Sequence, residues 1–308
     1  MEEALAKEVR SLDESKFLDF EKVKTQPITL DQLKRTHVEN DVKGNPLMGM
    51  YHFMLFETII QMAQEYNYGV EVYDMFAAQN RDRYQQGVVL NPQVEGIYGE
   101  RAVEAYTLRR VFANIRLTDF DDAETTTNLA IAYHQKGIQV GFGPMVRICH
   151  NQCLLAPELY AATYAERGRG TEGIQLPHLI EIVRSWFSDA KRLVEEQRAK
   201  IERMKQIVIG ASELFQIIGM LTAIRVKCDS TEKELKDDRQ YLTYPLNQSQ
   251  INKLTEMLLL TSLRNGRVTV WDLYNTATEM YKPSAMDIPS ALPQNRQMVR
   301  FIDEMYFG

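Results

Sequence analysis

The stretch "GIQVGFGPMVRICHNQCLL", residues 137–155, decides how the middle of the chain folds. It sets two glycines, Gly141 and Gly143, together with an arginine, a histidine and two cysteines in an apolar run. Glycine inside a strand pattern marks a bulge or a point where another backbone passes closely. We therefore predict a core strand whose glycines meet another part of the chain, with a break in the strand at Gly143–Pro144.

A second strand pattern lies upstream, in residues 104–119, "EAYTLRRVFANIRLTD". Side chains alternate here with period two, which is typical of a strand. One face is mostly apolar, interrupted only by Arg109, and carries Ala105, Thr107, Val111, Ala113, Ile115 and Leu117. Residues 129–151 add further strands around a tight turn at Gln135–Gly137. Together these patterns predict an α+β fold, with an antiparallel sheet at about residues 104–153 flanked by helices.

Helical patterns surround the sheet and fill the C-terminal half. Apolar residues three and four apart predict a buried helix at 50–66, one long amphipathic helix at 179–208, and a second, more buried helix at 211–226. A further helix follows with Ser249 as its N-cap. The last predicted helix starts at a capping box, Thr269–Asp272, and ends before Pro283. We divide the chain into a charged N-terminal arm (1–47), an α+β core domain (48–170) and a helical region (171–308).

Composition limits the class of protein. The chain has 308 residues, a net charge of −6 and three cysteines, Cys149, Cys153 and Cys228. No apolar run reaches the roughly 18 residues needed to span a bilayer, and the charged start lacks a secretory signal. These features predict a cytoplasmic protein of a bacterial host cell, without a disulfide framework. The acidic balance argues against coating nucleic acid by bulk charge, but it leaves room for a local basic stripe.

Metal and catalytic motifs are weak. Cys149, His150 and Cys153 lack the second ligand pair that zinc requires, so we interpret the cysteines as packing residues. The carboxylates of "TDFDDAETTT" (118–127) form the one candidate Mg²⁺ site, alternatively a solvated turn; they are Asp119, Asp121, Asp122 and Glu124. Glycine-rich phosphate motifs of the standard patterns are missing. We predict no catalytic residue, no metal and no cofactor.

The second face of the 104–119 strand combines aromatic and basic residues. Aromatic rings on a sheet stack bases and arginines neutralise phosphates, although a covering helix would also explain such a face. The candidate nucleic-acid contacts are Tyr106, Arg110, Phe112, Asn114, Arg116, Arg147, Asn151, Arg167 and Arg169.

Two segments carry a family resemblance: the 137–155 stretch and "VTVWDLYNTATEMYKPSAMDIPSALPQN" near the C-terminus. Over about residues 120–300 the chain resembles phage- and plasmid-associated proteins of unknown function (the domain of unknown function nine-three-two type), with a Val-Arg-x-Cys-x-Asn core motif. The matching residues are Val146, Arg147, Cys149, Asn151, Trp271, Asn275 and Thr278. His150 departs from the pattern. The resemblance implies a mobile-element context, and in outline the chain is similar to phage single-strand annealing proteins.

Three hypotheses follow. The first is a non-enzymatic protein that binds single-stranded DNA or RNA, possesses strand-annealing activity in recombination or replication, and self-associates through the 179–208 helix or the N-terminal arm. The second is a structural or host-interaction phage protein that acts through protein–protein contacts. The third is a Mg²⁺-dependent phosphodiester enzyme at the 118–127 carboxylates. No membrane partner is expected.

Overall fold

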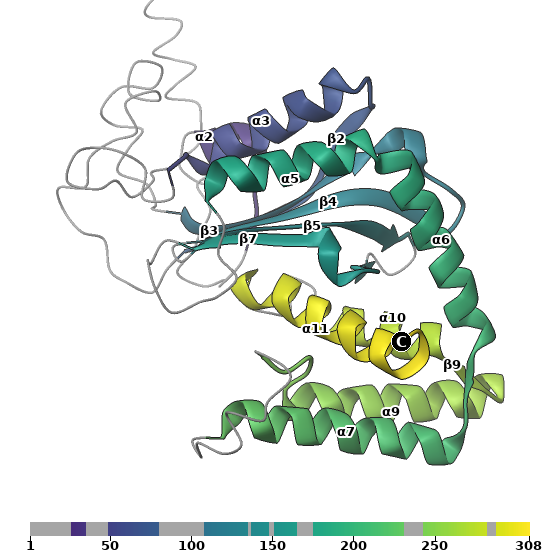
Figure 1. Ribbon diagram of the computed structural model, residues 1–308. Helices are drawn as coiled ribbons and strands as arrows, with labels where there is room; N and C mark the ends of the chain where they lie inside the picture. The colour runs from purple at the N-terminus through teal and green to yellow at the C-terminus, as the bar shows by residue number, and fades with distance from the viewer. Residues whose placement is uncertain are drawn as a thin grey trace, which may run out of the picture.

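The computed structural model describes residues 26–34, 49–79, 108–134, 137–147, 151–164, 175–230, 243–281 and 288–308. Within them the chain forms an antiparallel sheet with helices on both faces (Figure 1), which confirms the predicted α+β class. The strand order is β1-β2-β3-β4-β5-β6, and β7 also pairs with β5. The strands are β1 (Gln26–Pro27), β2 (Val70–Gln79), β3 (Leu108–Leu117), β4 (Thr125–His134), β5 (Gly137–Val146), β6 (Asn151–Gln152) and β7 (Tyr160–Tyr164).

One face of the sheet is covered by the helices α2 (Leu30–Lys34), α3 (His52–Glu65) and α5 (Leu176–Ser188). The alternate residues of β3 that were predicted to face the core do so, and they share one apolar cluster with α3 and α5. The predicted buried helix at 50–66 is α3, which contributes Phe56 and Ile59 to this cluster. This cluster is the main core of the sheet.

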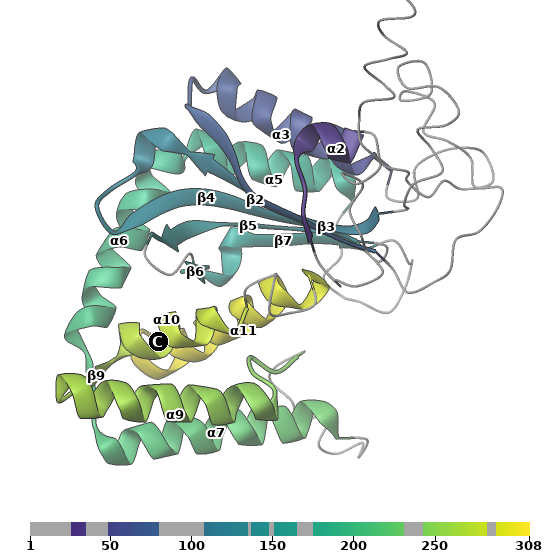
Figure 2. The same ribbon diagram turned by 180° about the vertical axis from the view of Figure 1, so that it is seen from behind.

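The opposite face of the sheet is covered by α11 (Ile288–Tyr306), a helix that was not predicted from the sequence and that contains Pro293. Small side chains on this face, such as Ala130 and Ala132, let the helix approach, and Leu292 of α11 packs among them. Alongside α11 lies α10 (Val270–Glu279), and below both lies an antiparallel helix pair, α7 (Ala211–Asp229) and α9 (Gln248–Asn265), as Figure 2 shows from behind.

Strand β5 continues through Gly143–Pro144, so the predicted break is wrong. The predicted close approach is present instead. A Cβ atom on Gly143 would lie 1.9 Å from the carbonyl oxygen of Cys153, and one on Gly141 would lie 2.7 Å from Leu154 Cδ2. The amide of Cys153 donates a hydrogen bond to the Pro144 carbonyl over 2.8 Å. The chain after β6 therefore passes directly beneath β5, where only glycine leaves room.

The predicted single helix at 179–208 is two helices, α5 and α6 (Ala190–Gln206), separated at Asp189. The backbone of Asp189 leaves helical geometry, with φ −101° and ψ 7°. Val194 of α6 packs in the core of the sheet. Ile201 packs in a second apolar core, which α6 forms with α7, α9, α10 and α11 and which we call the lower helical core. The bend lets α5 cover the sheet while α6 runs down to the helical layers (Figure 1). A boundary near residue 170 therefore does not separate two independent cores.

A two-stranded ribbon, β8 (Val208–Ile209) with β9 (Val268–Thr269), joins one end of the α7–α9 pair to α6 and α10. The capping box at Thr269–Asp272 is confirmed at the start of α10. The N-cap of α9 is Asn247, two residues before the predicted Ser249. The remaining short elements are the 3-10 turns η3 (Thr118–Phe120) and η4 (Pro157–Leu159).

We expect Gly143→Ala to lower the free energy of unfolding by about 3 kcal/mol, because the new methyl group would overlap a backbone carbonyl that cannot turn away. Gly219 in α7 is the matched control, since a Cβ there meets nothing within 4 Å. Gly219→Ala should raise stability by up to about 1 kcal/mol through helix propensity. Urea unfolding measures both changes, and equal stability of the two variants would contradict the close passage.

Candidate functional site

The predicted nucleic-acid contacts fall into three groups. Tyr106, Arg167 and Arg169 lie outside the described residues. For Arg110 and Asn151 the structure describes only the backbone, which pairs in β3 and β6 respectively. The side chains of Phe112, Asn114, Arg116 and Arg147 are described, so the hypothesis can be compared with their surroundings.

Phe112 and Asn114 are not surface residues. Phe112 is 2% exposed and packs against Leu154 and Leu292 beneath the sheet. Asn114 is 4% exposed, and its amide nitrogen lies 3.9 Å from the sulfur of Met145. A base cannot stack on Phe112 in this arrangement because α11 and the 153–155 segment already cover that face. This part of the predicted interface is therefore a core, and the correction follows from the unpredicted helix α11.

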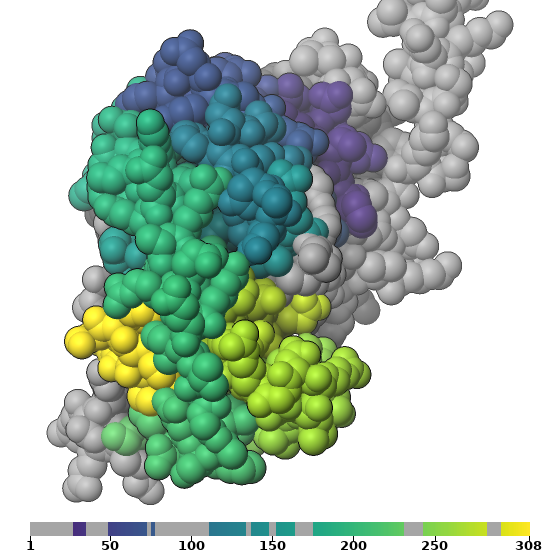
Figure 3. Space-filling view, turned by 90° about the vertical axis from the view of Figure 1, so that its right-hand side faces the viewer, coloured from purple at the N-terminus to yellow at the C-terminus, as the bar shows by residue number. Residues whose placement is uncertain are grey.

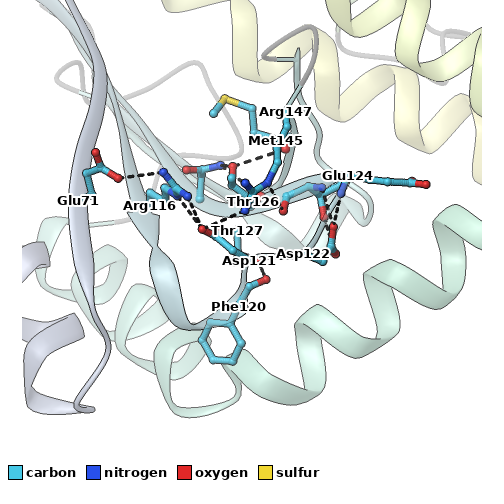
Figure 4. A network of polar contacts seen from close by, with 12 residues as sticks. Glu71, Arg116, Phe120, Asp121, Asp122, Glu124, Thr126, Thr127, Met145 and Arg147 are labelled. Carbon is cyan, nitrogen blue, oxygen red and sulfur yellow. Dashed lines mark hydrogen bonds and ion pairs between the residues drawn. The ribbon is translucent and has the colours of Figure 1, made fainter.

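Arg116 and Arg147 do come together, around one carboxylate (Figure 4). Arg116 forms an ion pair with Asp121 and a second one, of 2.9 Å, with Glu71 on β2. The Arg147 Nη2 atom lies 3.3 Å from the same Asp121 oxygen. The hydrogen bonds that Arg116 donates to Asp121 raise the pKa of Arg116 above its usual value. Two predicted phosphate-binding arginines thus form a charge-compensated group with carboxylates of their own chain.

Two further carboxylates of the 118–124 loop, those of Asp122 and Glu124, hold α6 against the end of the sheet. Asp122 is 2.9 Å from Arg198 Nε, and Glu124 is 2.6 Å from Lys205 Nζ. Arg198 also donates a 2.5 Å hydrogen bond to the carbonyl of Phe120. These contacts join the β3–β4 connection to α6, so the acidic loop fixes the position of the helix against the sheet.

Asp122 also organises the loop itself. Its carboxylate accepts hydrogen bonds from the amides of Glu124 (2.8 Å) and Thr125 (2.7 Å) and from the Thr125 hydroxyl (2.9 Å). Burial by itself would raise the pKa of Asp122, but these hydrogen bonds and the charge of Arg198 lower the pKa below its usual 3.8. The acid is thus held in its ionised form.

The candidate Mg²⁺ site of the third hypothesis gains no support from this geometry. Among the residues the structure describes, no group of three or more histidine, cysteine, aspartate or glutamate side chains is placed to hold a metal ion. Asp121, Asp122 and Glu124 point instead at arginine and lysine, and Asp119 accepts a 2.5 Å hydrogen bond from the Gly69 amide.

Cys153 is fully buried in the lower helical core, which agrees with the packing interpretation, whereas Cys149 and His150 lie outside the described residues.

A shallow cavity of about 590 Å³ lies between α6 and the end of α11. Its charged groups are already engaged: Lys200 pairs with Asp303, and the Arg203 guanidinium lies 4.8 Å from the ring centroid of Phe307. Lys200 also donates a 2.5 Å hydrogen bond to the Leu155 carbonyl. The cavity therefore offers no free charge for a ligand from these residues.

An apolar surface on the α7–α9 pair was missed by the sequence analysis. The prediction that α7 is more buried is wrong, because Phe215 is 60% exposed, and Leu263 of α9 is 83% exposed. In the described part of the chain, the large apolar side chains that stand exposed all belong to β8, α7 and α9: Val208, Phe215, Met220, Val226, Leu259, Leu260 and Leu263. The run Leu258–Leu260 is the sequence feature that indicates this exposed surface, because three consecutive leucines of a helix cannot all face one core.

The position of this surface makes it accessible. Figure 3 shows α9, in lime green, projecting at the lower part of the molecule, away from the sheet. Exposed apolar residues scattered singly are ordinary, but a contiguous set marks an interaction site. None of the described helices is long and apolar enough to cross a membrane.

Comparison with known proteins gave no match to a family model, a curated protein or a solved structure. The resemblance to phage- and plasmid-associated proteins therefore stays a prediction from the quoted motifs.

We expect Asp122→Asn to lower the free energy of unfolding by about 1 kcal/mol near neutral pH. The substitution removes the charge that pairs with Arg198 and that strengthens the hydrogen bonds within the loop. A lowered pKa stabilises the fold above the unfolded value of 3.8 and ceases to do so as pH falls through the folded value. The difference from wild type should therefore shrink below pH 3.8. Thermal melts across this pH range measure it; a difference independent of pH would contradict the role of the charge.

Proposed function

We propose that this protein works by binding other protein surfaces, with the exposed apolar side chains of β8, α7 and α9 as its contact surface. The observation that carries the proposal is the concentration of exposed leucine, phenylalanine, valine and methionine on this one layer. Burying such side chains is the main driving force of protein association. Of the three hypotheses, the interaction protein is the one that requires this surface.

The architecture supports the same conclusion. The predicted sheet interface is filled by α11, and the arginines that were expected to meet phosphate are paired with Asp121 and Glu71. Of the four carboxylates in the candidate Mg²⁺ site, those of Asp122 and Glu124 hold α6. The charged groups described at the end of the sheet are thus engaged in contacts within the chain, whereas apolar side chains of α7 and α9 face solvent.

The test places the photo-crosslinking residue benzoylphenylalanine at position 263 and, as a control, at Glu195, an exposed position on α6. We expect covalent protein adducts from position 263 after illumination of expressing cells, and none from position 195, because only the first lies in the apolar surface. Mass spectrometry of each adduct identifies the captured chain. Equal labelling from both positions, or none from 263, would refute the proposal.

Single-stranded nucleic-acid binding, the first hypothesis, is the second candidate. Of its contacts with described side chains, Arg147 is the most exposed, with 39% of its side chain accessible. The phage or plasmid context implied by the family resemblance favours it. The remaining contacts would come from Tyr106, Arg110, Asn151, Arg167 and Arg169.

The structure leads us to expect that Arg116→Ala with Arg147→Ala lowers the melting temperature but leaves the affinity for labelled single-stranded DNA unchanged, because both arginines already neutralise Asp121. Titrations at about 50 and 200 mM salt report phosphate contacts through their salt dependence. A salt slope reduced by about two in the double variant would instead establish these arginines as phosphate contacts.

A further inference from the structure

The outward face of α9 carries an apolar stripe with opposite charges at its two ends. Glu256, Leu260, Leu263 and Arg264 follow one another at spacings of four, three and one residues, so they share the side of the helix opposite the buried Ile251, Leu254 and Leu258. Leu259 borders the stripe and is also exposed. The stripe therefore reads acid, leucines, base along the chain.

The charges of Glu256 and Arg264 are unpaired within the part of the chain that the structure describes. The structure gives neither Glu256 nor Arg264 an ion-pair partner among the residues it describes, in contrast to Arg225 of α7, which pairs with Asp229. Both side chains are exposed. They are thus available to a partner that presents a base and an acid in the reverse order.

We infer that the occupant of this surface is a second copy of the same chain, packed with its α9 antiparallel to the first across a two-fold axis near Leu260. In that arrangement the leucines of the two stripes meet each other, and each Glu256 lies beside the partner's Arg264. A two-fold interface presents the same patch on both copies, so each contact occurs twice. This inference rests on the proposed function and names the partner of its surface.

Antiparallel packing is selected by the charges. A parallel pair would set Glu256 against the partner's Glu256 and Arg264 against the partner's Arg264. Lys253 lies at the acidic end, one turn further out and beyond the leucine contact. It is level with the exposed Arg267, which follows the end of the partner helix at Asn265. The register therefore opposes unlike charges at both ends of the leucine contact.

Helix α7 extends the same surface. It runs antiparallel to α9, and the β8–β9 ribbon brings the start of α7 level with the end of α9. Phe215 of α7 and Val208 of β8 consequently lie at the Leu263 end of the stripe, and both are more than half exposed. The second copy would cover them together with the leucines, which gives the contact an aromatic anchor of the kind common at interfaces.

The first experiment is sedimentation velocity of the full chain from nanomolar to high-micromolar concentration. We expect a concentration-dependent monomer–dimer equilibrium in the wild type. Leu263→Asp should raise the dimer dissociation constant by about 30-fold, as loss of a buried interface anchor does. Ala199→Asp, a matched change at an exposed position on α6, should leave it unchanged. Since Leu263 is 83% exposed, its replacement spares the fold.

The second experiment reverses the charges. Glu256→Arg and Arg264→Glu should each weaken the dimer by about tenfold, because each places like charges together at two symmetry-related points. The double variant Glu256→Arg with Arg264→Glu should return to the wild-type dissociation constant. Circular dichroism melts confirm that the three variants remain folded.

The outcomes separate this inference from the proposed function. A wild-type protein that stays monomeric at all concentrations, or a dimer insensitive to Leu263→Asp, overturns pairing through α9. Single charge reversals without effect, or a double variant that fails to recover, overturn the antiparallel arrangement. If position 263 still crosslinks to a different protein in cells, the proposed function stands without the second copy; if it crosslinks to nothing, both fail.

Discussion

The passage of residues 153–155 beneath β5 is the constraint on which the arrangement of the layers depends. Gly143 leaves the space that the Cys153 carbonyl fills, and the Pro144 carbonyl accepts the Cys153 amide. The next residue, Leu154, then hydrogen-bonds through its amide to the hydroxyl of Tyr274 on α10 over 2.8 Å. Burial raises the pKa of Tyr274 well above its usual range, so this hydroxyl keeps its proton. A polar contact inside an apolar core thus ties the helical layers to the sheet.

The second tie between the layers is α6, whose two halves belong to different cores. Its upper residues pack with α5 on the sheet and its lower residues pack with α7 and α10. Arg198 and Lys205 connect it to the 118–124 loop by partly exposed ion pairs. Such pairs contribute little stability individually, about 0–1 kcal/mol each, so their principal effect is to fix where the helix lies. The acidic loop therefore belongs to the scaffold.

The sheet is covered on both faces, and the arginines described at its end, Arg116 and Arg147, are paired with carboxylates. The distinctive surface of the described molecule is therefore the outermost helix pair. Its inner faces fill the lower core, while its outer faces keep leucines and Phe215 in water. Exposed apolar area of this kind is costly for solubility and is retained where a partner covers it. In the proposed dimer, the charges at the ends of the α9 stripe favour antiparallel over parallel packing of the two helices, a choice that the leucines alone would not determine.

Local patterns in the chain were sufficient for the α+β class, the core face of β3, the helix α3, the close approach at Gly143 and the capping box at Thr269, because period, glycine placement and capping chemistry act over a few residues. They could not show that α11 covers Phe112, that the chain bends at Asp189, or that Arg116 and Arg147 share Asp121. Each of these depends on which distant segment packs against a strand face, and a face that carries both aromatic and basic residues has the same sequence pattern whether a helix or a ligand covers it. The outward leucines of α9 likewise became visible as a surface only once the inner face had been filled.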